Sequence, residues 1–185
     1  IACMHQAGMA IEDMIPHLEN VAQVDGRMEK IDFGQDFHVI VDYAHTPDGY
    51  EKLFAYAEEI AEDHDIYVVF GAPGKRDKVK RKVLGAIVGR HCKTAYLCEE
   101  DARDETAAEI AAMIAEGIAE SGGHHVFIEK RYEAIETAIR NAKPGDVVFV
   151  LGKGSEKYLD LGKGKEYWMG DVDAAKLAVK KLLGK

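Results

Sequence analysis

The stretch VIVDYAHTPDGYEKL, residues 39–53, joins an apolar run to a helix start through a short polar corner. The run ending at Asp42 is rich in β-branched residues and predicts a buried strand. Thr46 suits an N-cap and Pro47 the first helical position, so half of the corner is ordinary helix-start chemistry. Asp42 and His45 are different, because an acid at a strand end can bind a ribose hydroxyl and a neighbouring histidine can contact a base. For these two residues, binding and structural roles are equally well supported.

The same alternation of strand and helix continues along the chain. Apolar runs predict strands at residues 37–43, 65–71, 93–100, 124–129 and 145–152. Helical periodicity predicts helices from about Tyr50 and from Thr106, and over 78–91, 132–141 and 172–183. Strands separated by helices of this length imply right-handed crossovers. The sequence therefore predicts an α/β fold with an open, mostly parallel, Rossmann-like sheet of about six strands and helices on both faces.

The first 36 residues break this pattern. A short helix is expected near residues 10–18, and residues 21–34 are typical of a hairpin or an edge strand. We interpret this lead-in as a linker from a preceding domain that is missing from the chain.

Composition excludes several classes of protein. The chain of 185 residues carries a formal net charge of -9, which argues against a nucleic-acid binder because phosphate backbones are held by basic surfaces. No apolar run approaches the roughly 20 residues that span a bilayer. The cysteines Cys3, Cys92 and Cys98 lack metal-ligand spacing and fit unpaired thiols in a reducing compartment, so a cytoplasmic location is expected.

Polar residues follow four of the predicted strands. In open α/β sheets ligands bind at the carboxyl ends of the strands, so these corners are candidate sites. Their sequences are DYAHTPD (42–48), GAPGKRDK (71–78), CEEDARDE (98–105) and GKGSEKY (152–158).

The second corner begins the basic cluster at residues 75–82. Lys78, Lys80 and Lys82 fit a solvated helix face. Arg76 lies in the turn itself, and its planar guanidinium suits a carboxylate or a phosphate.

The third and fourth corners combine acids with glycines. Taken as a site, the carboxylates around Arg103 could hold an ammonium group while Arg103 pairs with a carboxylate, which would bind an amino acid at both ends. Glu156 is another candidate partner for an ammonium group. Taken structurally, the third corner is an exposed loop and the fourth an ordinary glycine-rich turn.

Together these motifs suggest a known family. GRMEKI, DYAHTPD, GKRDKVKR, EEDARDE and GKGSE, in this order, resemble the C-terminal domain of the Mur ligases, in particular the branch that adds the third amino acid of the peptidoglycan stem peptide. The resemblance covers the chain from about Val21. It implies an ATP-dependent amide-forming ligase that joins meso-diaminopimelate or L-lysine to UDP-MurNAc-L-Ala-D-Glu.

The resemblance also implies roles for individual residues. Arg27, Asp42 and His45 would contact the nucleotide. The incoming amino acid would be bound by Arg76, Asp101, Arg103, Gly152 and Glu156. No catalytic residue and no metal ligand is assigned within the chain.

The chain departs from the family pattern in three ways. No GKT-type phosphate loop occurs, so residues 1–22 are expected to be a linker from a missing central ATPase domain and residues 23–185 the C-terminal domain. ATP and Mg²⁺ would be bound mainly by the central domain, and the chain alone should not ligate. The family's DNPR appears as Glu100-Asp101-Ala102-Arg103, which leaves diaminopimelate and lysine both open, and Ser155 replaces the histidine of GKGHE.

Two other functions remain open at this point. One is a non-catalytic α/β module that binds a nucleotide or a protein partner. The other is a related folylpolyglutamate-type or muropeptide ligase. The expected partners in the main hypothesis are UDP-MurNAc-dipeptide, a diamino acid and the enzyme's own N-terminal and central domains, with no nucleic acid and no membrane.

Overall fold

A mixed sheet of six strands forms the centre of the molecule in the computed structural model, which describes residues 1–18 and 23–185. The strands lie in the order β1-β2-β6-β3-β4-β5. β1 pairs antiparallel with β2, and every other neighbouring pair is parallel. Their bounds are Glu29–Lys30 (β1), His38–Asp42 (β2), Ile66–Phe70 (β3), Thr94–Leu97 (β4), His125–Phe127 (β5) and Val147–Leu151 (β6). The predicted fold class is confirmed.

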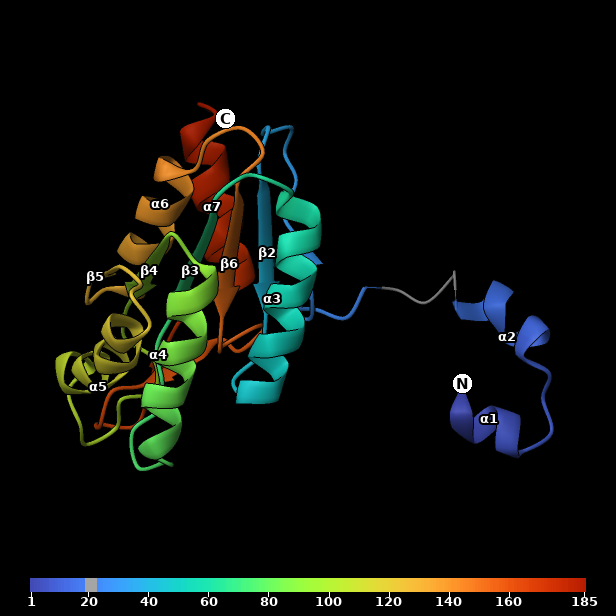
Figure 1. Cartoon of the computed structure of the whole chain (residues 1–185), viewed down its shortest axis with the longest axis horizontal. Coiled ribbons are helices and arrows are strands. Elements are labelled where there is room, and N and C mark those ends of the chain that lie inside the picture. Colours follow the sequence, from blue (N-terminus) through green and yellow to red (C-terminus); the bar gives the residue numbers. More distant parts are fainter. Residues whose placement is uncertain (19–22) are drawn as a thin grey trace.

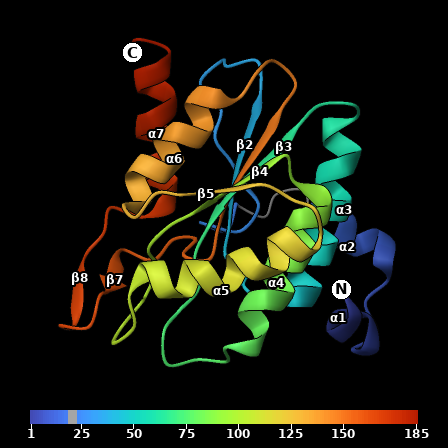
Figure 2. The same ribbon diagram turned by 60° about the vertical axis from the view of Figure 1, so that its left-hand side comes forward.

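Helices cover both faces of this sheet, as Figures 1 and 2 show. α3, α4 and α5 pack on one face, and α6 and α7 pack on the other. In β6 the alternation of a strand sends Phe149 into the first core and Val148 and Val150 into the second. The helices are α1 (Ala2–Gln6), α2 (Ile11–Leu18), α3 (Pro47–Ala61), α4 (Val79–His91), α5 (Ala107–Glu120), α6 (Arg131–Asn141) and α7 (Asp171–Leu182).

α4 and α5 cross at very short distance because glycines line their contact. A Cβ atom added at Gly85 would lie 2.0 Å from the carbonyl oxygen of Ile114, and one at Gly117 would lie 2.0 Å from that of Lys82. Only glycine leaves room for the two backbones at this separation.

Two features were not predicted. β7 (Tyr158–Asp160) and β8 (Lys165–Tyr167) form a separate antiparallel hairpin, and each strand is too short for a readable alternation. α1 is a single short helix with no buried residue.

The expected helix near residues 10–18 is present as α2, and the expected edge strand is β1. Figure 1 shows α1 and α2 to one side of the sheet and its covering helices. The predicted linker ends at residue 22 and the resemblance is predicted to start at Val21, and both of these positions lie among residues 19–22, outside the described residues. Within residues 1–18 and 23–185, no helix is long and apolar enough to cross a membrane.

Strand order brings the four polar corners together. β2, β6, β3 and β4 are successive neighbours and run in the same direction, so their carboxyl ends lie along one edge of the sheet.

Candidate functional site

Two adjoining hollows lie at this edge. The first, called the β2 hollow, measures about 430 Å³ and is lined by residues of the corner after β2 and the start of α3, together with Arg27. The second, called the β4–β6 hollow, measures about 400 Å³ and is lined by residues of the other three corners. Tyr43 and His45 line both hollows, so the two are separated by a shared wall.

All eight predicted site residues line one or both of these hollows. Arg27, Asp42 and His45 line the β2 hollow. The β4–β6 hollow is lined by six of the eight predicted residues, namely His45, Arg76, Asp101, Arg103, Gly152 and Glu156. Residues from four separate corners thus lie around one small volume.

Asp42 has a structural role as well as a place in the β2 hollow. Its Oδ1 accepts a hydrogen bond from the Ala44 N–H at 2.7 Å, and its Oδ2 accepts one from the Met28 N–H at 2.8 Å. The second bond fastens the segment that carries Arg27 to the end of β2. Each carboxylate oxygen has a further lone pair, so Asp42 can still accept a hydroxyl donor from a ligand.

Arg27 and His45 are both exposed and are both arranged around Tyr43. The Arg27 guanidinium carbon lies 4.7 Å from the centroid of the Tyr43 ring, within the range of a cation–π contact. His45 Nδ1 lies 2.9 Å from the Tyr43 carbonyl oxygen, and because a carbonyl only accepts, Nδ1 carries the proton.

The rest of the first corner starts a helix, as predicted. Thr46 is the N-cap of α3, and its Oγ1 accepts a hydrogen bond from the Gly49 N–H at 3.2 Å. Pro47 is the first helical residue, and Asp48 pairs with Lys52 on the helix surface.

Arg76 is an exposed cation at the β4–β6 hollow. Among the described residues it has no hydrogen bond or ion pair, so its guanidinium is available to a ligand. The turn before it is fixed by a close approach: a Cβ atom at Gly74 would lie 1.9 Å from the carbonyl oxygen of Ala102. This contact packs the corner after β3 against the corner after β4.

The lysines that follow Arg76 only partly match their prediction. Lys78 and Lys82 are exposed, whereas Lys80 is half-buried and lines the β4–β6 hollow. Arg81 is fully buried and forms a two-point ion pair with Glu105, with N–O distances of 2.8 and 2.9 Å. Hydrogen bonds from Arg81 and Lys78 hold the pKa of Glu105 well below its usual range. Arg81 therefore belongs to the core and not to a solvated basic cluster.

Arg103 is half-buried and partly engaged by the protein. Its Nη1 donates to the carbonyl oxygen of Gly74, and its Nε lies 3.8 Å from Asp160 Oδ2. The residue has a φ of 55°, a left-handed conformation that non-glycine residues adopt at a cost. These contacts hold the guanidinium in the lining of the β4–β6 hollow.

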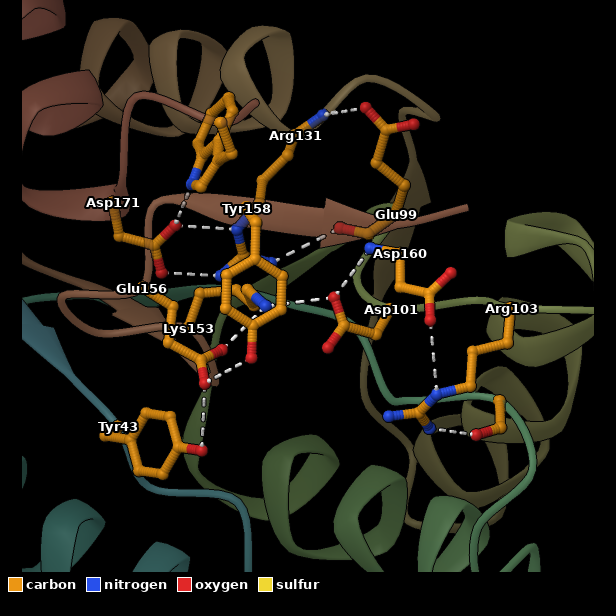
Figure 3. Close-up of polar contacts among 12 residues, drawn as sticks. Tyr43, Glu99, Asp101, Arg103, Arg131, Lys153, Glu156, Tyr158, Asp160 and Asp171 are labelled. Atoms are coloured by element: carbon orange, nitrogen blue, oxygen red, sulfur yellow. Dashed lines mark hydrogen bonds and ion pairs between the residues drawn. The ribbon is translucent and has the colours of Figure 1, made fainter. Parts of the chain in front are cut away.

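A buried lysine joins the two acids predicted to bind the amino acid (Figure 3). Lys153 Nζ lies 2.9 Å from Asp101 Oδ1 and 2.6 Å from Glu156 Oε2, and the lysine side chain is 1% exposed. Burial lowers the pKa of Lys153, and hydrogen bonds to the two acids raise it by more, so the net pKa is raised. The sequence does not reveal Lys153 as a site residue, because a lysine between two glycines gives no signal of burial.

Two tyrosines complete the surroundings of Glu156. The hydroxyls of Tyr158 and Tyr43 lie 3.1 and 3.5 Å from Glu156 Oε1. Burial and the Glu156 charge raise the pKa of Tyr43. Both tyrosines therefore donate to Glu156, and Tyr43 links it to the shared wall.

The Glu100 carboxylate lies so close to position 152 that only glycine fits there. Gly152 has a φ of 106°, and a Cβ atom there would lie 2.6 Å from Glu100 Oε2. Glu100 is 7% exposed, and its carboxylate has no hydrogen bond to any described residue. Burial raises its pKa to about 7, against opposing effects of Arg131 and Lys153. A carboxylate in this state can exchange a proton near neutral pH or accept a cationic donor from a ligand.

Beneath the corners lies a fully buried ion pair that the sequence does not predict. Arg131 at the start of α6 donates to both oxygens of Asp171 at the start of α7, each at 2.7 Å, and to the carbonyl oxygen of Leu151 at 2.7 Å. Trp168 Nε1 donates to Asp171 Oδ1 at 3.3 Å. Figure 3 shows the Arg131–Asp171 pair. Through the bond to the Leu151 carbonyl, the pair fixes the end of β6, from which the Gly152 turn departs.

Sequence comparisons identify the family to which this chain belongs. A family profile described as "Mur ligase, glutamate ligase domain" matches residues 26–154. A UDP-N-acetylmuramyl-tripeptide synthetase from Roseiflexus sp. (strain RS-1) is 42% identical over 173 residues, which cover 91% of this chain and 33% of that protein. A UDP-N-acetylmuramoyl-L-alanyl-D-glutamate--2,6-diaminopimelate ligase from Geobacillus kaustophilus (strain HTA426) is 38% identical over 161 residues, which cover 87% of this chain and 32% of that protein.

Solved structures of other proteins have a similar fold. A structure of a UDP-N-acetylmuramoyl-L-alanyl-D-glutamate--2,6-diaminopimelate ligase matches with a TM-score of 0.73 at 28% identity, over 97% of this chain and 36% of that one. E. coli FolC in complex with ADP shares the fold, with a TM-score of 0.61 at 23% identity, over 82% of this chain and 34% of that one. The chain spans about a third of the length of the curated relatives it matches. The chain belongs to the Mur ligase family, and it matches the C-terminal glutamate ligase domain of that family.

Proposed function

We propose that this chain is the C-terminal domain of an ATP-dependent ligase that joins meso-diaminopimelate or L-lysine to UDP-MurNAc-L-Ala-D-Glu in cytoplasmic peptidoglycan synthesis. One observation carries the proposal: the β2 hollow and the β4–β6 hollow share the wall made by Tyr43 and His45. Two ligands bound there would lie side by side, as a reaction between an activated acid and an amine requires. The names of the relatives from Roseiflexus and Geobacillus supply the substrate class.

In the β2 hollow, Arg27, Asp42 and His45 would contact the nucleotide. Asp42 retains acceptor capacity for a ribose hydroxyl, and the exposed Arg27 guanidinium suits phosphate oxygens. In such a reaction ATP converts the substrate carboxylate into an acyl phosphate, which the amine of the incoming amino acid then attacks, releasing phosphate.

In the β4–β6 hollow, the charges match those of an amino acid. The unpartnered Arg76 would bind the α-carboxylate, and Arg103 would approach a second carboxylate where the substrate has one. Glu156, with Glu100 and Asp101 beside it, would hold an ammonium group, with Gly152 leaving the space. The chemistry left to this chain is positioning of the amine and neutralisation of charge.

A dedicated Mg²⁺ cage built from protein side chains is absent from the described part of the chain. The described residues contain no group of three or more histidines, cysteines, aspartates or glutamates that could hold a metal ion. We therefore assign Mg²⁺ and most contacts to the ATP phosphates to a central domain outside this chain. In the same proposal, residues 1–22 link to that domain, the N-terminal domain binds the UDP substrate, and the chain alone is inactive.

Purification of the complete polypeptide that contains this chain permits a direct test. ADP release should require both UDP-MurNAc-dipeptide and a diamino acid, and mass spectrometry should detect the tripeptide product. Nucleotide binding without any amide product would favour a non-catalytic module. Glutamate addition to a folate substrate would favour a folylpolyglutamate-type ligase, and turnover of a released muropeptide would favour a recycling ligase.

A further inference from the structure

Lys153 is a buried cation shared by two corners of the site. Asp101 belongs to the corner after β4 and Glu156 to the turn after β6, and the Lys153 ammonium lies within 2.9 Å of both carboxylates. The same ammonium lies 4.2 Å from the centroid of the Tyr158 ring. A buried lysine needs such partners, because burial alone would favour its neutral form.

The contacts of Asp101 extend this link across the β4–β6 hollow. Asp101 Oδ1 accepts a second hydrogen bond from the Asp160 N–H at 3.0 Å. The Asp160 carboxylate lies 3.8 Å from Arg103 Nε, and the Asp160 carbonyl accepts from the Arg103 N–H at 2.9 Å. Lys153 therefore connects Glu156 to Arg103 through a continuous series of polar contacts (Figure 3).

We propose that Lys153 is a positioning residue that fixes Asp101 and Glu156 as a preformed acidic wall for the ammonium group of the incoming amino acid. The inference rests on the proposed function and adds a residue to it. Lys153 is almost fully buried and does not line the β4–β6 hollow. It acts by holding two carboxylates in one orientation, which lowers the entropic cost of binding a cation between them.

A purely structural lysine and a positioning lysine predict different kinetics. The test uses the complete polypeptide with Lys153→Met, and Lys157→Met as the control. Lys157 is an exposed lysine four residues further on, and it pairs with Asp173 away from both hollows. We expect Lys153→Met to raise KM for the diamino acid about tenfold or more while KM for ATP stays within about twofold. Lys157→Met should leave both constants unchanged.

A second variant covers the case in which Lys153→Met fails to fold. Lys153→Met with Asp101→Asn removes the buried lysine together with its buried partner Asp101, and Glu156 keeps its hydrogen bonds from Tyr43 and Tyr158, so folding should be retained. The double variant should keep the raised KM for the diamino acid. A wild-type KM in the folded double variant, or an equal rise in both KM values in either variant, would overturn the inference.

The experiments distinguish a failure of the proposed function from a failure of the Lys153 inference. Wild-type protein without amino-acid-dependent ADP release would overturn the proposed function and this inference with it. Active wild-type protein whose Lys153→Met variant matches the Lys157→Met control would overturn this inference alone.

Discussion

Glu100 shows how a single residue carries both a cost and a function in this site. Its carboxylate is buried beside Gly152 without a hydrogen-bond partner, and burial raises its pKa to about 7. Ionisation of an unpartnered buried carboxylate opposes folding. The same group is available to an ammonium ligand, which would supply the missing partner. Residues that weaken a fold while lining a hollow are expected at binding sites.

Replacing Glu100 with glutamine should change how stability depends on pH. The folded-state pKa lies above the unfolded value of 4.5, so folded protein binds the proton more tightly. The group's contribution to stability is thus fully present below about pH 4.5 and is lost as the pH rises through about 7. Relative to wild type, Glu100→Gln should gain at most about 3 kcal/mol between pH 4.5 and pH 8.

Urea unfolding of both proteins at several pH values checks this. Glu116→Gln on the exposed face of α5 is the control and should track wild type at every pH. A Glu100→Gln difference that stays constant with pH would show that Glu100 keeps an ordinary pKa.

At the scale of elements, the crossing of α4 and α5 sets the position of the two corners that precede them. Gly85 and Gly117 let the helix backbones approach closely, and Glu105 in the corner before α5 pairs with Arg81 of α4. The sequence predicts both helices, and Thr106 with Glu109 forms a capping box at the start of α5. It does not predict the crossing, because a glycine inside a helix is locally only a loss of propensity.

Gly117→Ala should therefore destabilise the fold, although alanine is the better helix former. The added Cβ would lie 2.0 Å from the Lys82 carbonyl oxygen, and separation of the helices should cost about 1–3 kcal/mol. Thermal unfolding measures this loss. Glu116→Ala, one residue earlier on the exposed face, should change stability by less than about 0.5 kcal/mol. Equal melting temperatures for Gly117→Ala and Glu116→Ala would contradict the close crossing.

Across the whole molecule, the Arg131–Asp171 pair joins elements that the sequence places far apart. It links α6, α7 and the end of β6 below the binding corners. Burial lowers the pKa of Arg131, and the Asp171 charge and hydrogen bonds raise it by more, so the net pKa is raised and Arg131 stays protonated. Both side chains of the pair are fully buried, with 0% exposure to solvent.

Replacing one residue of this pair should lower the free energy of unfolding far more than replacing both. Arg131→Met leaves a buried carboxylate unpaired and should cost about 3–5 kcal/mol. Arg131→Met with Asp171→Leu removes both charges and should recover much of the loss. Urea unfolding distinguishes the variants, and a double variant no more stable than the single one would show that the charges do not interact in this way.

The sequence predicts the positions of the corners better than the contacts inside them. Strand–helix alternation predicts the sheet, and the rule that ligands bind at strand ends selects the four corners. Lys153 and Arg131 could not be found this way, because their burial depends on partners such as Asp101 and Asp171 that lie far along the chain. The β7 strand, which contributes Tyr158, is too short to predict from periodicity.

The central claim is that the β4–β6 hollow binds the amino acid substrate, and Arg76 tests it most directly. Arg76 is exposed and has no protein partner among the described residues, so Arg76→Ala should not reduce stability. The measurement is KM for the diamino acid in ADP release by the complete polypeptide, with Lys82→Ala, an exposed cation outside both hollows, as the control. We predict a rise of about tenfold or more for Arg76→Ala and none for Lys82→Ala. Equal KM values in the two variants would contradict the account.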